Sequence, residues 1–229
     1  MDIAFEPNKK LDQYFLKNQK MLDLEVKSAE LKNDDIVLEV GAGIGNLTER
    51  IAVHCKVIAI EKDGRFIDAL KKIENAEIVH GDALRIIKNL KFNKIISNIP
   101  YSLSQKLILE FLKKEWSVAV IIVQKEFAIK MKENTKLGML IQDCAVMEII
   151  KEIPGDDFTP KAVDSTMIGL KQKKIMDEKF WKFLSRIYRQ KNRNVKNVVE
   201  CDEKYAKKKI HQLTLSELKE IYKNFCRDE

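Results

Sequence analysis

The sequence predicts an α/β fold in which a doubly wound sheet is followed by a small helical domain. Three observations lead to this prediction: short β-branched runs alternate with amphipathic stretches, a glycine-rich turn follows the first run, and the composition changes near residues 171–178. With 229 residues the chain is long enough for one full-size core and a small second domain.

Five short apolar runs lack the polar alternation of a half-exposed strand, so we predict strands that are buried on both faces. They span residues 36–40, 57–60, 76–79, 94–97 and 118–123. The stretches 46–54, 64–73 and 104–114 carry apolar residues three and four positions apart, as amphipathic helices do. This alternation favours a parallel, Rossmann-like sheet. The runs 141–153 and 164–172 are predicted to complete a seven-stranded sheet that ends near Leu170.

The last part of the chain is predicted to be helical. Residues 178–190 carry an apolar stripe at helical spacing, and residues 214–225 open with a capping-box pattern from Thr214 to Glu217. The stripe consists of Phe180, Phe183, Leu184 and Ile187. We therefore expect two domains, residues 1–173 with the sheet and residues 174–229 with the helices.

The excess positive charge lies in the helical part. From Lys173 onward the chain has 16 Lys and Arg but only 9 Asp and Glu, whereas residues 1–172 have 26 of each sign. Such asymmetry favours a nucleic-acid partner for the second domain, with a solvated helical face as the alternative. Residues 186–196 hold five cations and no acid, and these are expected to contact phosphates: Arg186, Arg189, Lys191, Arg193 and Lys196.

Several classes of protein and site are disfavoured. No apolar run approaches the roughly 18 residues of a membrane span, and the first residues do not resemble a secretion signal, so we expect a cytoplasmic protein. The cysteines and histidines are scattered without paired ligand spacing, so neither a metal nor a disulfide is expected. The cysteines are Cys55, Cys144, Cys201 and Cys226.

A glycine turn joins the first strand to the first helix and predicts a nucleotide site. Gly41, Gly43 and Gly45 allow the backbone to turn tightly and a ligand to approach. Asn46 stands where a dinucleotide site usually has Gly or Ala close to the pyrophosphate, which favours a nucleoside without phosphates. Alone, the turn could be a tight connection.

Two acids follow the next two strands. Glu61 ends the second strand, where a carboxylate can accept hydrogen bonds from ribose hydroxyls, and Asp82 follows the third, where a short acceptor can meet an adenine amine. Because both acids stand at the carboxyl ends of successive strands, they and the glycine turn together predict an adenosine site.

The fourth strand ends in Asn98-Ile99-Pro100-Tyr101. This segment resembles the signature of methyltransferases that modify exocyclic amines of nucleobases. Such an amine is a poor nucleophile and must be positioned; the Asn98 side chain and the Pro100 carbonyl can accept its hydrogens, and Tyr101 can stack an extruded base. A proline-stiffened turn with a buried tyrosine is the structural alternative.

Further segments resemble the KsgA-type family of small-subunit ribosomal RNA adenine N6,N6-dimethyltransferases. They are residues 9–16, 123–126, 158–165, 189–197 and 213–218. The resemblance implies an S-adenosyl-L-methionine site and an RNA contact at Lys125. The implied cofactor-binding residues are Gln13, Tyr14, Leu16, Gly41, Gly43, Glu61, Asp82 and Asn98. Two departures stand out: Asp12 replaces a family Gly, and segment 158–165 is one residue short, with Ala162 in place of a second Pro.

The same resemblance implies the reaction. Members of this branch add two methyl groups to each of two adjacent adenines near the 3′ end of small-subunit rRNA, within an immature ribosomal subunit, and we expect this chain to do so as a monomer. The alternatives are an erythromycin-resistance-type methyltransferase of large-subunit rRNA and a non-enzymatic assembly or transcription factor on the same fold. Asn46 and the lack of a catalytic dyad disfavour a nicotinamide oxidoreductase.

Overall fold

The structure, a computed structural model, describes residues 6–8 and 11–225. Lys9 and Lys10 of the family-like segment, and Cys226, lie outside the described residues. The chain forms two compact units. The first comprises residues up to 128 together with 147–172, and the second comprises 129–146 together with 173 onward. The second unit thus begins after Gln172, near the expected boundary, and also takes in the internal segment 129–146.

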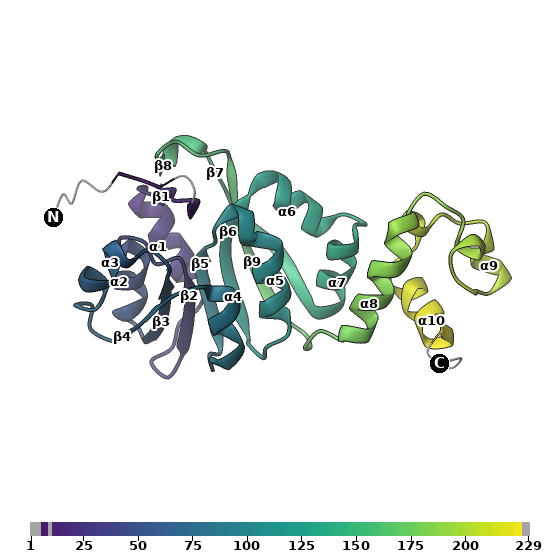
Figure 1. The fold of residues 1–229 in the computed structure, drawn as a ribbon, viewed down its shortest axis with the longest axis horizontal. Helices are drawn as coiled ribbons and strands as arrows, with labels where there is room; N and C mark the ends of the chain where they lie inside the picture. The colour runs from purple at the N-terminus through teal and green to yellow at the C-terminus, as the bar shows by residue number, and fades with distance from the viewer. Residues whose placement is uncertain (1–5, 9–10, 226–229) are drawn as a thin grey trace. The chain divides into compact units, whose positions relative to one another are not determined.

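The first unit is built on a seven-stranded sheet with the order β4-β3-β2-β5-β6-β9-β7 (Figure 1). The five predicted strands are confirmed, and adjacent members of this set are parallel. They are β2 (Ile36–Val40), β3 (Lys56–Glu61), β4 (Ala76–His80), β5 (Lys94–Asn98) and β6 (Val118–Gln124). Next to β6 lies β9 (Ser165–Gln172), which runs antiparallel to it, and β7 (Ala145–Ile153) forms the edge.

Helices connect the parallel strands. The three predicted ones appear as α2 (Asn46–Ala52), α3 (Gly64–Leu70) and α5 (Ser104–Leu112). Also present are α1 (Gln19–Ser28), α4 (Ala83–Ile86), α6 (Lys125–Lys132) and α7 (Lys136–Cys144). The strand predicted over 141–153 is wrong for its first four residues, which end α7. Thr135 caps this helix by accepting the Gly138 N–H at 3.0 Å, and β7 starts only at Ala145.

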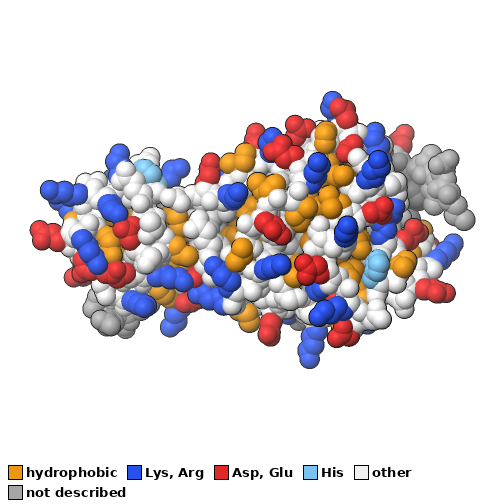
Figure 2. All heavy atoms as spheres, turned by 180° about the vertical axis from the view of Figure 1, so that it is seen from behind, with side chains coloured by type: hydrophobic (Ala, Val, Ile, Leu, Met, Phe, Trp, Pro, Cys, Tyr) orange, Lys and Arg blue, Asp and Glu red, His pale blue; other side chains and the backbone are white. Residues whose placement is uncertain are grey.

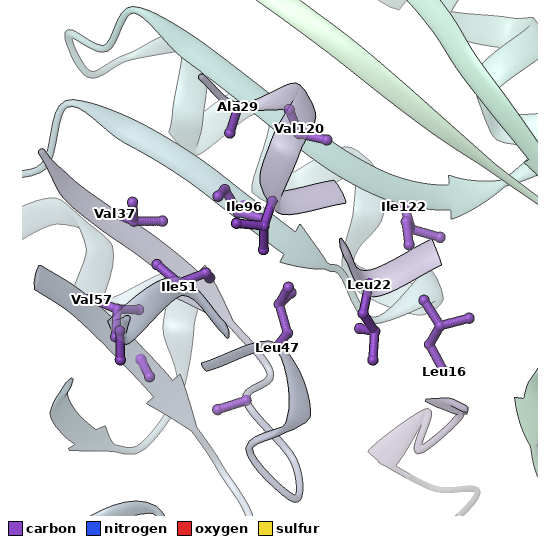
Figure 3. Packing of buried hydrophobic residues seen from close by; sticks show 14 of the residues in the cluster. Leu16, Leu22, Ala29, Val37, Leu47, Ile51, Val57, Ile96, Val120 and Ile122 are labelled. Atoms are coloured by element: carbon purple, nitrogen blue, oxygen red, sulfur yellow. The ribbon is translucent and has the colours of Figure 1, made fainter. Parts of the chain in front are cut away.

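The core of the first unit lies between α1, α2 and the central strands. Leu22 of α1 packs with Val120 and Ile122 of β6, and all three are buried (Figure 3). Leu16 joins them from β1 (Phe15–Leu16), which pairs antiparallel with β8 (Phe158–Thr159) in a separate two-stranded sheet. The residues that precede the large sheet are therefore held against its core.

In the second unit, α8 (Glu178–Ile187), α9 (Glu203–Ala206) and α10 (Leu215–Phe225) confirm the predicted helical character. All four residues of the apolar stripe on α8 are buried. The capping box is also confirmed, because the Thr214 N–H donates to Glu217 at 2.9 Å and the Glu217 N–H donates to Thr214 at 3.3 Å. Every helix among the described residues is too short or too polar to cross a bilayer.

Candidate cofactor and base site

A pocket opens at the carboxyl ends of β2, β3 and β5 in the first unit, where a doubly wound sheet usually binds its ligand. All residues predicted to bind the cofactor line this pocket, and so do the predicted catalytic residues. These are Gln13, Tyr14, Leu16, Gly41, Gly43, Glu61, Asp82, Asn98, Pro100 and Tyr101. The structure thus brings the two predicted sets together, while their individual roles stay predictions.

The turn after β2 needs its glycines. Gly41 and Gly43 have φ angles of +80° and +55°, a region that strains residues with a Cβ. A Cβ on Gly43 would also lie 2.8 Å from Phe15 Cε1, so a side chain there would require the Phe15 ring to shift. The turn therefore keeps the backbone open to a ligand on one side and to Phe15 on the other.

Glu61 is buried and already holds the turn together. Its Oε1 accepts the N–H groups of Lys62 at 2.8 Å and Asp63 at 2.7 Å, and its Oε2 accepts that of Gly43 at 2.7 Å. A carboxylate has about four acceptor positions. Glu61 therefore has room for one further strong hydrogen bond, at Oε2, and contact with both ribose hydroxyls would have to share that oxygen.

Asp82 combines a structural and a potential binding role. Its Oδ1 accepts the Leu84 N–H at 3.0 Å and caps α4. Its Oδ2 makes no hydrogen bond to the described residues, so this oxygen is available to an amine in the pocket.

Two buried carboxyl groups interact at this end of the sheet: Glu39 lines the pocket, and Glu25 of α1 is close enough to feel the Glu39 charge. Burial raises the pKa of Glu39 to about 8 against the effect of a 2.7 Å hydrogen bond from Thr48, and the Glu61 charge adds to the rise. Glu25 is fully buried; burial raises the pKa of its carboxyl well above the usual range, and the Glu39 charge contributes. Neither Glu25 oxygen has a hydrogen-bond partner among the described residues. At neutral pH these raised pKa values favour the protonated, uncharged form of both carboxyl groups.

The segment before the sheet forms one wall of the pocket. Asp12 adopts φ +55°, a region that suits the Gly expected here from the family resemblance and that Asp tolerates better than most residues. Its Oδ2 accepts the Ser102 N–H at 2.9 Å and so ties this wall to the loop after β5.

Gln13 holds the same wall to the loop after β3. Its Nε2 donates to Asp63 Oδ2 at 2.7 Å, and its Oε1 accepts from Arg65 at 3.2 Å. The hydrogen bond from Arg65 is the main reason why the pKa of Asp63 falls to about 2. The amide of Gln13 is therefore engaged within the protein, and its contact with a cofactor remains a prediction.

In the loop after β5, Asn98 Nδ2 donates to the Tyr14 carbonyl at 3.4 Å, which leaves Oδ1 as an acceptor facing the pocket. The rings of Tyr14 and Tyr101 stack with centroids 5.5 Å apart. The Tyr101 hydroxyl forms a 2.8 Å hydrogen bond with Ser165, a residue of the family-like segment 158–165 to which no role was assigned from sequence.

Pro100 is more occupied than its predicted role requires. Its carbonyl accepts the Leu103 N–H at 3.0 Å and the Ser104 hydroxyl at 3.3 Å. An amine hydrogen can therefore reach this oxygen only if the Ser104 hydroxyl turns away, whereas Asn98 Oδ1 needs no such change.

The predicted RNA-binding residues lie in different surroundings. Lys125 pairs with Glu152 at 2.8 Å on the surface of the first unit. In the second unit, the Arg186 guanidinium lies over the Phe225 ring, and Arg193 and Lys196 are exposed. Arg189 and Lys191 line a second pocket. Lys and Arg side chains stand out from the surface in the face shown in Figure 2.

No three His, Cys, Asp or Glu side chains among the described residues are grouped as metal ligands would be.

The fold and the pocket together define the class of Rossmann-like methyltransferases. The family described as ribosomal RNA adenine dimethylase matches residues 4–224, and the chain belongs to this family, whose members use S-adenosylmethionine. A "Probable ribosomal RNA small subunit methyltransferase A" from Methanococcus maripaludis is 38% identical over 210 residues, which are 84% of this chain and 79% of the relative.

Two solved structures share the fold. A dimethyladenosine transferase from Plasmodium falciparum superposes with a TM-score of 0.85 at 23% identity, over 93% of this chain and 98% of that one. The 23S rRNA methyltransferase ErmE superposes with a TM-score of 0.67 at 22% identity, over 80% of this chain and 82% of that one. At these identities the likeness concerns the fold alone.

Proposed function

We propose that this protein transfers methyl groups from S-adenosylmethionine to the N6 amines of adenines in small-subunit rRNA. The specific form of the proposal is two methylations on each of two adjacent adenines near the 3′ end, carried out by a monomer on immature subunits in the cytoplasm. The main observation behind this proposal is that Glu61 and Asp82, the acids expected to bind adenosine, line the same pocket as the loop Asn98–Tyr101.

The residues present fit this cofactor. Gly41 and Gly43 keep the floor of the pocket free of side chains, the free Asp82 oxygen suits the adenine amine, and Glu61 Oε2 suits a ribose hydroxyl. When bound, S-adenosylmethionine supplies a methyl group on a cationic sulfonium.

The chain's own contribution to the reaction is positioning. An N6 hydrogen donated to Asn98 Oδ1 fixes the direction of the amine lone pair, and because an amide is not a base, this interaction orients the amine without removing its proton. Tyr101 offers a ring face to the target base, while its hydroxyl and its second face are anchored by Ser165 and Tyr14.

Methylation of large-subunit rRNA remains the second candidate, because the fold of ErmE covers most of this chain. The two activities differ in the RNA that carries the product. The first candidate is supported by the 38% identity to a relative that is named for the small subunit. The aligned residues make up 84% of this chain and 79% of that relative.

The test is to map methylated adenines in rRNA from a strain that lacks the gene, complemented with wild type or with Asn98→Ala. We expect dimethyladenines in small-subunit rRNA with wild type and their loss with the variant. Purified Asn98→Ala should still bind the RNA, since its interaction with the amine matters most on the way to the transition state. Dimethyladenines that persist without the gene, or that depend on it only in large-subunit rRNA, would overturn the assignment.

A further inference from the structure

A second pocket lies wholly within the second unit and shares no lining residue with the cofactor pocket. It is formed by the connection between α6 and α7, by the turn after α8, and by His211. Sequence reasoning assigned the connection no role, and only Arg189 and Lys191 of the lining residues belong to the predicted RNA-binding set.

The pocket carries an uncompensated positive charge. Lys136, Arg189 and Lys191 line it together with one acid, Glu133, and none of these three cations has an ion pair with a described residue. The Lys136 ammonium instead lies 4.4 Å from the centroid of the Trp181 ring. Burial, and after it the charge of Arg189, lowers the pKa of Lys136. Two cations close enough to disfavour each other are relieved when an anion enters between them.

One neutral donor complements these charges. Tyr188 lines the pocket, and its hydroxyl is buried without a hydrogen-bond partner among the described residues. Burial raises the pKa of Tyr188 to about 12, so the hydroxyl keeps its proton and remains a donor at neutral pH. His211 donates from Nδ1 to the Lys191 carbonyl at 2.8 Å, since a carbonyl can only accept, so in the neutral ring Nε2 is an acceptor and His211 shapes the pocket rather than donating to an anion.

We propose that this pocket binds a backbone phosphate of the ribosomal RNA, held by Lys136 and Arg189, and that the Tyr188 hydroxyl, which is buried in the free protein, turns toward the phosphate to donate a hydrogen bond. The inference rests on the proposed function and adds to it two residues outside the expected RNA-binding set. A tetrahedral phosphate accepts hydrogen bonds from several directions, and here the donors come from two separate chain segments. Arg193 and Lys196 are exposed and follow Arg189 in the chain. They can therefore contact neighbouring phosphates of the same RNA strand, whose charges are regularly spaced.

The first test compares Lys136→Gln with Lys182→Gln in the full-length protein. Lys182 is exposed on α8 and does not line the pocket, so it serves as the matched control. Binding to deproteinised small-subunit rRNA and to immature subunits is measured over a range of salt concentrations. Lys136→Gln should weaken both interactions several-fold and reduce the salt slope by about 0.7 to 0.9. Lys182→Gln should bind like wild type, and both variants should keep wild-type affinity for S-adenosylmethionine.

The second test is Tyr188→Phe, which removes only the hydroxyl. Because that hydroxyl has no partner among the residues that the structure describes, the variant should melt at or above the wild-type temperature. RNA binding should nevertheless fall by about tenfold, as expected when a hydrogen bond to a charged group is lost. If Tyr188 has a merely structural role, the variant should instead melt below wild type with unaltered RNA affinity, and this result would overturn the proposal.

Each remaining outcome has a separate meaning. Unchanged salt slopes for Lys136→Gln, with normal wild-type methylation, would overturn the phosphate site and leave the proposed function intact. A loss confined to whole subunits would assign the pocket to a protein, and protection of the pocket by inorganic phosphate with unchanged RNA affinity would assign it to a free anion; either result overturns an RNA contact. If wild type bound S-adenosylmethionine but neither bound nor methylated rRNA, the proposed function itself would fail.

Discussion

Replacing Glu25 by Leu should stabilise this protein. The carboxyl is fully buried on α1 and neither oxygen has a partner among the described residues, so the folded state bears a desolvation cost that a Leu side chain of similar size does not. A buried polar group without a partner costs about 1–3 kcal/mol, and the free energy of unfolding should rise by about that amount at neutral pH.

The same substitution should change how stability depends on pH. Burial raises the pKa of Glu25 above that of the unfolded chain, so between pH 5 and the folded-state pKa the unfolded state binds fewer protons than the folded state. Stability is therefore full below about pH 4.5 and falls as the pH rises, by up to about 1.4 kcal/mol per pH unit for each such carboxyl. Glu39, with its pKa raised to about 8, acts in the same direction.

Urea unfolding of wild type and Glu25→Leu at pH 5, 6, 7 and 8 measures both effects. The variant should lose stability about half as steeply, because only Glu39 still contributes. Glu25→Gln is the matched control: it should flatten the pH dependence equally but gain less stability, since its amide is still buried and polar. A Leu variant that is less stable than wild type at pH 8 would refute this account of the carboxyl.

Three further predictions concern the pocket. Asp12→Asn should melt and react like wild type, whereas Asp12→Ala should lose about 1–3 kcal/mol of stability in urea unfolding, because the hydrogen bond to Ser102 is lost and Ala is strained at positive φ; equal stability of the two would contradict this reasoning. In single-turnover assays Tyr101→Phe should lower the methyl-transfer rate only slightly, although it removes the hydrogen bond to Ser165, whereas Tyr101→Ala should lower the rate severely. A wild-type rate for Tyr101→Ala would contradict the stacking role. Glu61→Gln should weaken S-adenosylmethionine binding by about 1.5–3 kcal/mol in calorimetry, and undiminished affinity would remove Glu61 from the site.

The sequence predicted those parts of the fold whose signal is local. The strand 36–40 was found with both ends correct because a short β-branched run before a glycine turn has few other interpretations. The run 141–144 was misassigned because four mixed residues show no clear period, and the helix there is set by the Thr135 cap upstream and by packing against α8 and α10. Pairing of β1 with β8 depends on residues far apart in the chain and gave no local signal.

The residues of the candidate site also fall into two groups, those that a local sequence signal could place and those whose contacts depend on tertiary structure. Gly41, Glu61 and Asn98 follow strand ends and could be placed from the sequence, because parallel strands bring their carboxyl ends to one edge. The contacts of Asp12 with Ser102 and of Tyr101 with Ser165 join residues 90 and 64 positions apart. Such contacts are decided by tertiary structure, and only the family-like segments that contain these residues hinted at their importance.

The pairing of β1 with β8 determines when the pocket can be completed during protein synthesis. The glycine turn, Glu61 and Asn98 leave the ribosome early, but β1 has its strand partner in β8, and the Tyr101 hydroxyl has its partner in Ser165. A nascent chain that ends before β8 therefore has an open wall where the finished protein has a closed one. We therefore expect cofactor recognition to be acquired late in translation, so that a protein that modifies ribosomal RNA becomes competent only after most of its own chain has emerged from a ribosome.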